Sequence, residues 1–154
     1  MGYSLAGLPQ ANADKVMELL QGCLSTYNDL SLVLKHAHWN VVGPSFIGVH
    51  EMIDPQVDFV RNSADEVAER IRTLGGVPDG RVSAIKKPLN YPLGRGLVSD
   101  HLKALDALYD EVIAANRKVI DETGELDAVS QDLIITQTGE LEKFQWFLRA
   151  HLES

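Results

Sequence analysis

The sequence predicts an all-α protein, a four-helix bundle with one long crossover between the second and third helices. Apolar residues recur every three or four positions in four long stretches, which is the spacing of the buried side of an amphipathic helix. Glycine and proline separate these stretches, and only the middle gap, residues 75 to 98, is long. The 154 residues, 45% hydrophobic and 23% charged, fit one globular domain over residues 1 to 154.

The first two helices are predicted over residues 11 to 39 and 45 to 74. Gly43-Pro44 separates them, and Pro44 is placed to open the second helix because its missing N–H is not needed there. Pro55 lies inside the second helix and is expected to kink it or to remove one backbone hydrogen bond. The helix is still predicted to continue, because the apolar period resumes at once after this proline. Gly75-Gly76 is its C-terminal signal.

The connection from residue 75 to 98 is rich in glycine and proline, with a short helix expected around Val82 to Lys86. The third helix is predicted to start at a Ser99 cap and to run to Gly124. The last helix is predicted over residues 127 to 152, with its apolar residues directed into the bundle.

The second predicted helix carries two pairs of potential metal ligands. His50 and Asp54 are four positions apart, and so are Asp65 and Glu69, so each pair lies on one side of the helix. The pairs lie about 22 Å apart along the helix axis, too far for one ion to bind both. All four positions are arranged symmetrically about the midpoint between residues 59 and 60. A second copy laid antiparallel about that point would bring His50 to Glu69 and Asp54 to Asp65, which predicts two sites at a two-fold dimer interface.

His38, at the end of the first predicted helix, is a further candidate ligand. Together these residues offer nitrogen and oxygen donors without a thiolate, which suits ferrous iron, manganese or zinc and does not suit copper(I). Redox chemistry at such a site would point to iron. Lys35 and Trp39 flank His38 and are expected to support the site, Lys35 by pairing with a carboxylate.

Three stretches of the chain match a family motif. The first is Lys35-His-Ala-His-Trp-Asn-Val-Val-Gly-Pro-Ser-Phe-Ile-Gly-Val-His-Glu-Met-Ile-Asp, and after Asp65 comes Ala68-Glu-Arg-Ile-Arg-Thr-Leu-Gly-Gly. The third is Gly139-Glu-Leu-Glu-Lys-Phe-Gln-Trp-Phe-Leu-Arg-Ala-His-Leu. These segments resemble the Dps-type mini-ferritins, particularly the actinobacterial members. The likeness extends over about residues 10 to 153, and its histidine-to-glutamate motif is highly specific.

The resemblance implies a ferritin-like bundle that assembles into a hollow dodecamer, oxidises ferrous iron, usually with hydrogen peroxide, and stores the ferric mineral inside. In that family the residues matching His38, His50 and Asp54 come from one subunit, and those matching Asp65 and Glu69 come from its two-fold mate. This agrees with the pairing expected from the spacing alone. Because the reaction consumes peroxide without releasing hydroxyl radical, the activity is expected to be protective against oxidative stress.

Acidic residues are expected to guide ferrous iron toward these sites. The formal net charge is −8 at pH 7, which favours the attraction of cations. The resemblance matches Asp132 to a position that lines the acidic three-fold pore of the family, with Asp127 beside it.

Direct DNA binding is not expected, although many members of the family use a lysine-rich tail for it. Phosphate contacts supply most of such affinity, and the first 14 residues contain no lysine or arginine. The last four residues, His151-Leu-Glu-Ser, contain none either. Lys86-Lys87 and Arg95 are the residues that could form a modest basic patch. No signal peptide or membrane-spanning run is present, so a cytoplasmic location is expected, with association with the nucleoid left open.

Other conspicuous residues are assigned structural roles. Cys23, the single cysteine, falls on an apolar helix stripe and is expected to be a buried thiol. The two tryptophans are expected first of all to pack against other side chains. His36 is expected to be structural or solvated, and His101 and His151 to be exposed.

Two alternatives to an iron-oxidising cage follow from the same residues. One is a nucleoid-coating DNA-binding protein, which a gel shift at low salt would detect. The other is a metal-dependent hydrolase on the same scaffold, in which a bound metal activates water toward an amide or ester. His50-Glu-Met-Ile-Asp54 is superficially similar to the zinc protease pattern H-E-x-x-H, but an aspartate replaces the second histidine, so a peptidase has little support.

Overall fold

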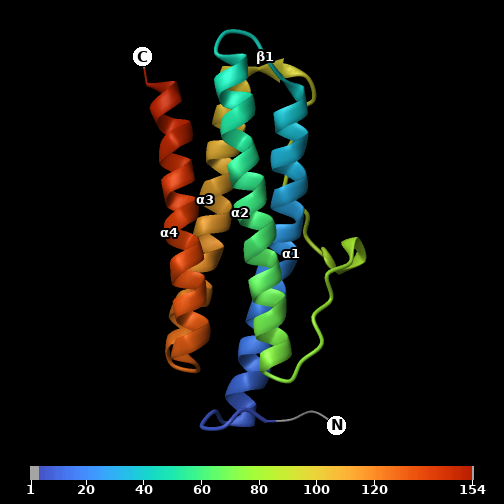
Figure 1. The fold of residues 1–154 in the computed structure, drawn as a ribbon, viewed down its shortest axis with the longest axis vertical. Helices are drawn as coiled ribbons and strands as arrows, with labels where there is room; N and C mark the ends of the chain where they lie inside the picture. Colours follow the sequence, from blue (N-terminus) through green and yellow to red (C-terminus); the bar gives the residue numbers. More distant parts are fainter. Residues whose placement is uncertain (1–3, 154) are drawn as a thin grey trace.

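The computed structural model describes residues 4 to 153 and has the predicted all-α architecture (Figure 1). The long helices α1 and α2 form one antiparallel pair, and α3 and α4 form the other. A long crossover returns the chain along the whole bundle before α3, so α2 and α3 run in the same direction. The elements in chain order are α1 (Gln10–Asn40), β1 (Val41–Val42), α2 (Phe46–Thr73), the 3-10 turn η1 (Val82–Ala84), β2 (Gly96–Leu97), α3 (Val98–Gly124) and α4 (Ala128–Leu152).

The corner between α1 and α2 is made by two residues in the left-handed region. Gly43 has φ +103° and Ser45 has φ +64°, and glycine adopts such a conformation at little cost. Helix α2 therefore begins at Phe46, after Ser45 at the N-cap position. The prediction that Pro44 opens this helix is wrong, because Ser45 turns the chain first. Pro55 lies within α2, which continues past it as one helix.

Helix α2 ends in the glycine turn that the sequence predicts. Gly75 has φ +96°, and the Gly76 N–H donates to the carbonyl of Ile71 over 2.9 Å. A left-handed glycine followed by this backward hydrogen bond satisfies carbonyls that the helix end leaves open. The short helix expected in the crossover is present as the single turn η1, and it ends at Ala84, before Lys86.

Side chains of α1 hold the crossover against the bundle. Gln21 donates to the carbonyl of Asp79 over 3.0 Å and accepts from its N–H over 2.8 Å. Asn28 donates to the carbonyl of Gly80, and further along a carboxylate oxygen of Asp29 accepts from the Leu89 N–H over 2.5 Å. The long connection is thereby fixed along the outer side of α1.

A short parallel strand pair, which the residue pattern does not predict, joins the α1–α2 corner to the last part of the crossover. Val41 lies opposite Gly96 and Val42 lies opposite Leu97, so β1 and β2 tie the α1–α2 corner to the start of α3. Helix α3 begins directly after β2, with Leu97 at the N-cap position. The predicted Ser99 cap is therefore wrong, because the strand pair already fixes the chain before that residue and places Ser99 inside the helix.

The core lies between the helices and contains both apolar side chains and paired polar groups. The Asn116 amide donates to the Tyr27 hydroxyl over 2.8 Å and to Thr138 Oγ1 over 3.2 Å. The Tyr109 hydroxyl donates to Gln56 Oε1 over 2.7 Å. Buried polar groups are costly unless they are hydrogen-bonded, so these contacts favour one arrangement of the helices. The largest fully buried residues are Tyr27, Tyr109, Leu20, Leu30, Leu34, Ile53, Leu74, Leu102, Leu105, Ile134, Leu141 and Leu148.

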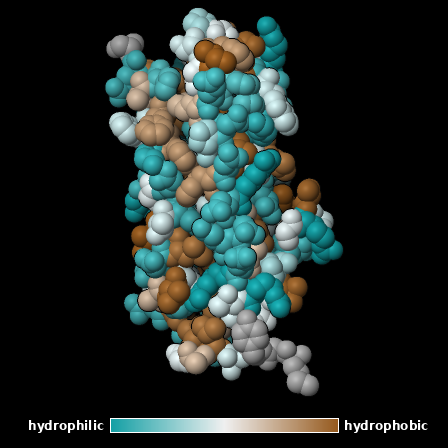
Figure 2. Space-filling view, in the orientation of Figure 1, coloured by the Kyte–Doolittle hydropathy of each residue, from teal (hydrophilic) through white to brown (hydrophobic). Residues whose placement is uncertain are grey.

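The surface is mixed, with hydrophilic residues along the middle of the face shown in Figure 2, where α2 lies in Figure 1. Trp39 and Trp146 are 69% and 63% exposed. Within one chain the expectation that they serve mainly in packing is wrong, because both project from the outer side of their helices. None of the helices between residues 4 and 153 combines the length and the apolar character that a membrane span requires.

Candidate metal centre

His38 and His50 meet where α1 ends and α2 begins. Their rings are stacked with centroids 3.6 Å apart, and each Nδ1 lies 2.8 Å from the backbone carbonyl oxygen of the other residue. A carbonyl oxygen only accepts, so each Nδ1 carries the proton and donates. In the neutral form of each ring the lone pair therefore lies on Nε2, and no hydrogen bond within residues 4 to 153 engages either Nε2. This is the tautomer that a metal-binding histidine uses.

Asp54 follows His50 by one helical turn and adds an ionised carboxylate to this group. The Lys35 ammonium lies 2.5 Å from Asp54 Oδ1, as the sequence analysis expects for this lysine, and His38 Nδ1 lies 3.3 Å from the same oxygen. The hydrogen bond from Lys35 holds the pKa of Asp54 below its ordinary value. About half of the Asp54 side chain is exposed, so the carboxylate is accessible from outside the chain.

Asp65 and Glu69 lie further along α2 and are exposed. Asp65 is about 16 Å from Asp54 along the helix axis, at 1.5 Å per residue. Within residues 4 to 153, no three histidine, cysteine, aspartate or glutamate side chains gather closely enough to hold a metal ion. One chain thus places His38 against both His50 and Asp54, without closing a group of three ligands, and leaves Asp65 and Glu69 further along α2.

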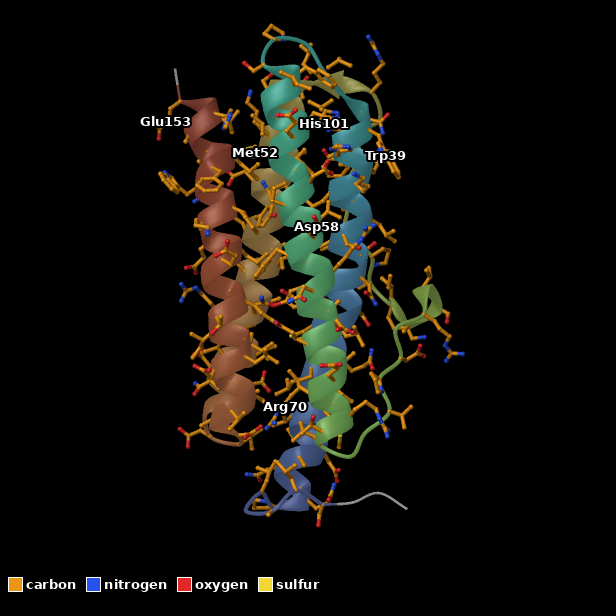
Figure 3. All side chains as sticks on the ribbon, in the orientation of Figure 1. Trp39, Met52, Asp58, Arg70, His101 and Glu153 are labelled. Carbon is orange, nitrogen blue, oxygen red and sulfur yellow. The ribbon has the colours of Figure 1, made fainter. Side chains whose placement is uncertain are left out.

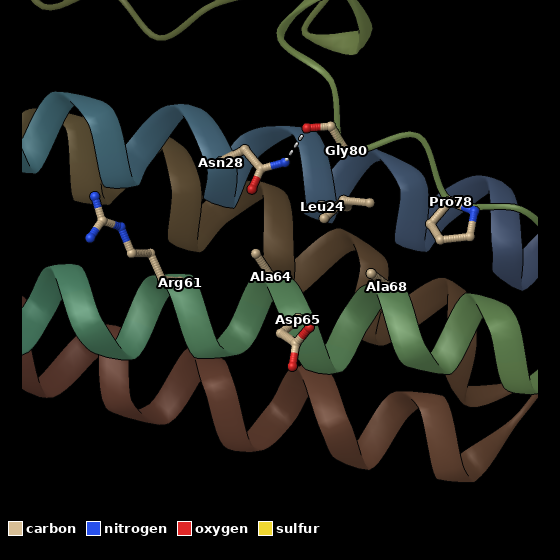
Figure 4. A pocket seen from close by; sticks show the side chains of 8 residues that line it. All are labelled: Leu24, Asn28, Arg61, Ala64, Asp65, Ala68, Pro78 and Gly80. Carbon is tan, nitrogen blue, oxygen red and sulfur yellow. Dashed lines mark hydrogen bonds between the residues drawn. The ribbon is translucent and has the colours of Figure 1, made fainter.

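The surface beside Asp65 is hollowed. A pocket of about 300 Å³ lies between α2, α1 and the first part of the crossover, and Figure 4 shows Asp65 and Arg61 at its edge. Leu24, Ala64 and Pro78 also line the hollow, so small and apolar side chains leave room beside the carboxylate. The Asp65 end of α2 is therefore open to groups from outside the chain.

A second hollow, of about 490 Å³, connects the predicted ligand Glu69 with the predicted pore residue Asp132. Glu66 also lines it, so three carboxylates border one space between α2 and α4, together with Arg70, whose charge is paired with Asp127. Carboxylates that share a concave surface attract cations more strongly than isolated ones. The arrangement is consistent with an acidic approach toward Glu69.

Asp127, the other predicted pore residue, forms hydrogen bonds and an ion pair within its own chain. Its carboxylate caps α4 by accepting from the backbone N–H groups of Val129 and Ser130, and it pairs with Arg70 over 2.7 Å. Arg70 lies at the lower end of α2 in Figure 3, next to the start of α4. Burial raises the pKa of Asp127, but the hydrogen bonds from Ser130 and Arg70 outweigh this and keep its pKa below the ordinary value.

The Asp127 pair predicts a pH-dependent contribution to stability. Because the folded-state pKa is lowered, the contribution is present above the unfolded pKa of about 3.9 and is lost as the pH falls through the folded value. Asp127→Asn keeps a good capping residue but loses the charge, and we expect it to lower the free energy of unfolding by about 1 to 3 kcal/mol at pH 7. Urea unfolding at fixed protein concentration should show this difference shrinking below about pH 4. The exposed neighbour Asp132→Asn is the control; an equal effect there would contradict the prediction.

The other histidines and the cysteine lie outside this group. His36 is exposed and contacts the carbonyl of Leu93 over 2.8 Å, and His151 is exposed, as predicted. His101 is fully buried, so the prediction that it is exposed is wrong. Its Nδ1 lies 2.6 Å from the Tyr91 hydroxyl and its Nε2 has no partner within residues 4 to 153. Cys23 is buried as predicted, and burial raises the pKa of its thiol to about 12.

Residue types do not reveal the backbone part of this site. The carbonyl oxygens of His38 and His50 orient the two rings, yet a main-chain acceptor has no signature in residue types. Trp39, labelled near the upper end of α1 in Figure 3, is exposed close to His38 rather than enclosed by the bundle.

Comparison with known proteins shows the family to which the chain belongs. Residues 17 to 154 match the family model of the ferritin-like domain. The DNA protection during starvation protein of Mycolicibacterium smegmatis is 59% identical over 99% of this chain and 85% of its own length. The solved structure of Mycobacterium smegmatis Dps superposes with a TM-score of 0.97 at 58% identity, covering all of this chain and 90% of that one. DpsA14 from Streptomyces coelicolor superposes with a TM-score of 0.95 at 50% identity over 99% of this chain and 92% of its own. The chain therefore belongs to the ferritin-like family and, within it, to the Dps proteins.

Proposed function

We propose that this chain is a subunit of a mini-ferritin cage that oxidises ferrous iron with hydrogen peroxide and stores the ferric product. In this proposal His38, His50 and Asp54 of one subunit bind iron together with Asp65 and Glu69 of its two-fold mate. The observation that carries it is the exchange of Nδ1–carbonyl hydrogen bonds between the two histidines, which leaves both Nε2 atoms without a hydrogen bond in residues 4 to 153, beside the Asp54 carboxylate. The remaining carboxylates lie on α2 but out of reach within one chain, so a second chain is needed to complete the site.

The donor set suits iron as a substrate. Imidazole nitrogen binds ferrous iron well, and carboxylate oxygen favours the harder ferric ion, so a mixed set retains the metal through oxidation. Two ferrous ions give up one electron each, and one peroxide molecule takes up both electrons and two protons to become two water molecules. Because the peroxide O–O bond receives both electrons in one event, no hydroxyl radical is released.

In this proposal the protein protects DNA by removing the reactants that damage it and not by binding to it. The related protein from Mycolicibacterium smegmatis is named for DNA protection during starvation, and removing ferrous iron and peroxide together would achieve this in the cytoplasm without contact with DNA. The basic residues of the crossover offer little for phosphate binding, since Lys87 already faces Glu111 at 3.7 Å and the net charge is −8. A dodecamer of two-fold dimers is the assembly we propose for the cage.

Stopped-flow absorbance tests this function directly. The purified assembly is loaded with ferrous iron without oxygen and then mixed with peroxide, and ferric iron formation is followed against the same iron without protein. We expect protein-bound iron to be oxidised faster than free iron, with soluble ferric product. Equal rates with and without protein would contradict the proposed activity and would favour a differently metallated, hydrolytic site.

A further inference from the structure

Two opposite side-chain charges in the middle of α2 have no partner in the described part of their own chain. Asp58 and Arg61 are both exposed, and neither side chain forms an ion pair or a hydrogen bond with a residue between 4 and 153. Figure 3 labels Asp58 about midway along the helix, and Figure 4 shows Arg61 one turn before Asp65. An ionised pair left unused at the centre of a helix suggests that its partners lie on another molecule.

Asp58 and Arg61 share one side of α2 with the proposed ligands. At about 100° per residue, they fall with those ligands in an arc of about 100° around the helix. We call this arc the α2 ligand face, and it consists of His50, Asp54, Asp58, Arg61, Asp65 and Glu69.

Asp58 and Arg61 are also related by the two-fold symmetry that relates the ligand pairs. They lie at equal distances from the midpoint between residues 59 and 60, about which His50 mirrors Glu69. In an antiparallel two-fold dimer, Asp58 therefore lies opposite Arg61 of the partner subunit, and the contact occurs twice.

Across the two-fold axis, the α2 ligand face would bring together both like and opposite charges. Asp54 would lie opposite Asp65 of the partner subunit, and two facing carboxylates repel one another unless a cation lies between them. Asp58 opposite Arg61 of the partner subunit is attractive without any metal. The face thus offers an attractive charge pair at the two-fold axis. On each side of the axis it offers a carboxylate pair that a bound iron ion would join, with Lys35 offsetting part of the Asp54 charge in the absence of iron.

We propose that Asp58 and Arg61 form reciprocal ion pairs across the two-fold axis and set the register in which the iron site assembles. A shift of the partner helix by one turn breaks both pairs, because on the α2 ligand face Asp58 would then lie opposite either Asp65 or Asp58 of the partner subunit. The occupant of this face is thus a second copy of the same chain. The inference rests on the proposed function, since it assumes the shared site that the register aligns.

Charge exchange tests the pairing. Asp58→Arg and Arg61→Asp each place like charges across the axis, whereas Asp58→Arg/Arg61→Asp restores opposite charges with their positions exchanged. We expect each single variant to weaken dimerisation and Co²⁺ binding at least about tenfold and the double variant to restore both, because like charges across an interface are strongly disfavoured. Sedimentation velocity measures the dimer, and the visible absorption of added Co²⁺ reports the assembled site. Asp121→Arg, an exposed change of equal charge on α3, is the control.

Each outcome of this series has a distinct meaning. Single variants that dimerise and bind Co²⁺ like the unmodified chain would overturn the pairing while leaving the proposed function intact. A double variant as weak as the single ones would also overturn it, because the two side chains would then not act on each other. An unmodified chain that neither dimerises nor binds Co²⁺ would instead contradict the proposed function.

Chemical coupling gives a second measurement that does not depend on weakened variants. Arg61→Lys supplies an amine that carbodiimide can join directly to a contacting carboxylate. We expect an amide to Asp58 of the partner subunit, seen as a band of twice the subunit mass in a denaturing gel and identified by peptide mass. The absence of this linked peptide from a dimeric sample would overturn the proposal.

Discussion

Replacing His38 and His50 together by alanine is expected to lower the rate of peroxide-dependent iron oxidation at least about 100-fold. Both imidazoles are lost as ligands, and even the outer partners of metal ligands typically contribute about 10- to 100-fold to affinity or activity. Stopped-flow absorbance after anaerobic loading with ferrous iron measures the rate. The matched control is His36→Ala/His151→Ala, because both of these histidines are exposed and lie outside the site.

The double alanine variant also removes the two hydrogen bonds that join the end of α1 to the start of α2. Circular dichroism and sedimentation therefore need to establish that the variant remains folded and assembled. Asp54→Asn provides a second test with a smaller structural change, since the amide keeps the shape of the side chain and leaves the histidine contacts in place. Oxidation at the unmodified rate in both variants would show that these residues are not the iron site.

The order and approximate length of the helices follow from the sequence because apolar spacing reflects which side of each helix is buried. Residues with a strong backbone preference also predicted the structure correctly. Gly75 is an example, because it adopts the left-handed conformation that ends α2. The predictions at Pro44 and Ser99 failed for a different reason. Both assume that a helix begins where a residue favours it, whereas here a left-handed Ser45 and the β1–β2 pair fix the starting points.

His101 shows most clearly what local sequence does not determine. A histidine in the first turn of a helix is usually exposed, but here the crossover folds over it, with Tyr91 bonded to Nδ1 and Gly96 close to Nε2. Burial lowers the pKa of this histidine, which favours the neutral ring. Its environment depends on a segment about ten residues away in sequence, whose path is set by contacts with α1 rather than by its own periodicity.

The candidate site contains one expectation that is confirmed and one that stays a prediction. Lys35 pairs with a carboxylate as expected, whereas the meeting of four α2 positions across a two-fold axis stays a prediction from the helical repeat. The backbone carbonyls that orient His38 and His50 depend on how closely the two helices approach at their corner. That distance is set by the packing of many side chains, which residue types alone do not specify.

Two inactive variants are expected to restore activity when they are combined, and this is the strongest test of a shared site. His50→Ala/Asp54→Asn removes ligands from one half of each site, and Asp65→Asn/Glu69→Gln removes them from the other half. A dimer of either variant alone has two defective sites. A mixed dimer has one site carrying all four changes and one site carrying none, because the two halves of each site come from different chains.

Random pairing of the two variants, produced together in equal amounts, should recover about a quarter of the unmodified activity per subunit, since about half of the dimers are mixed and each has one of two sites intact. Each variant carries a different affinity tag, so mixed assemblies can be purified and their iron oxidation measured by stopped flow. If each site lay within one chain, the mixture would stay inactive. If Asp65 and Glu69 did not bind iron, the second variant would be active on its own. Recovery in the mixture, with neither variant active alone, is the result that only a site built from two chains produces.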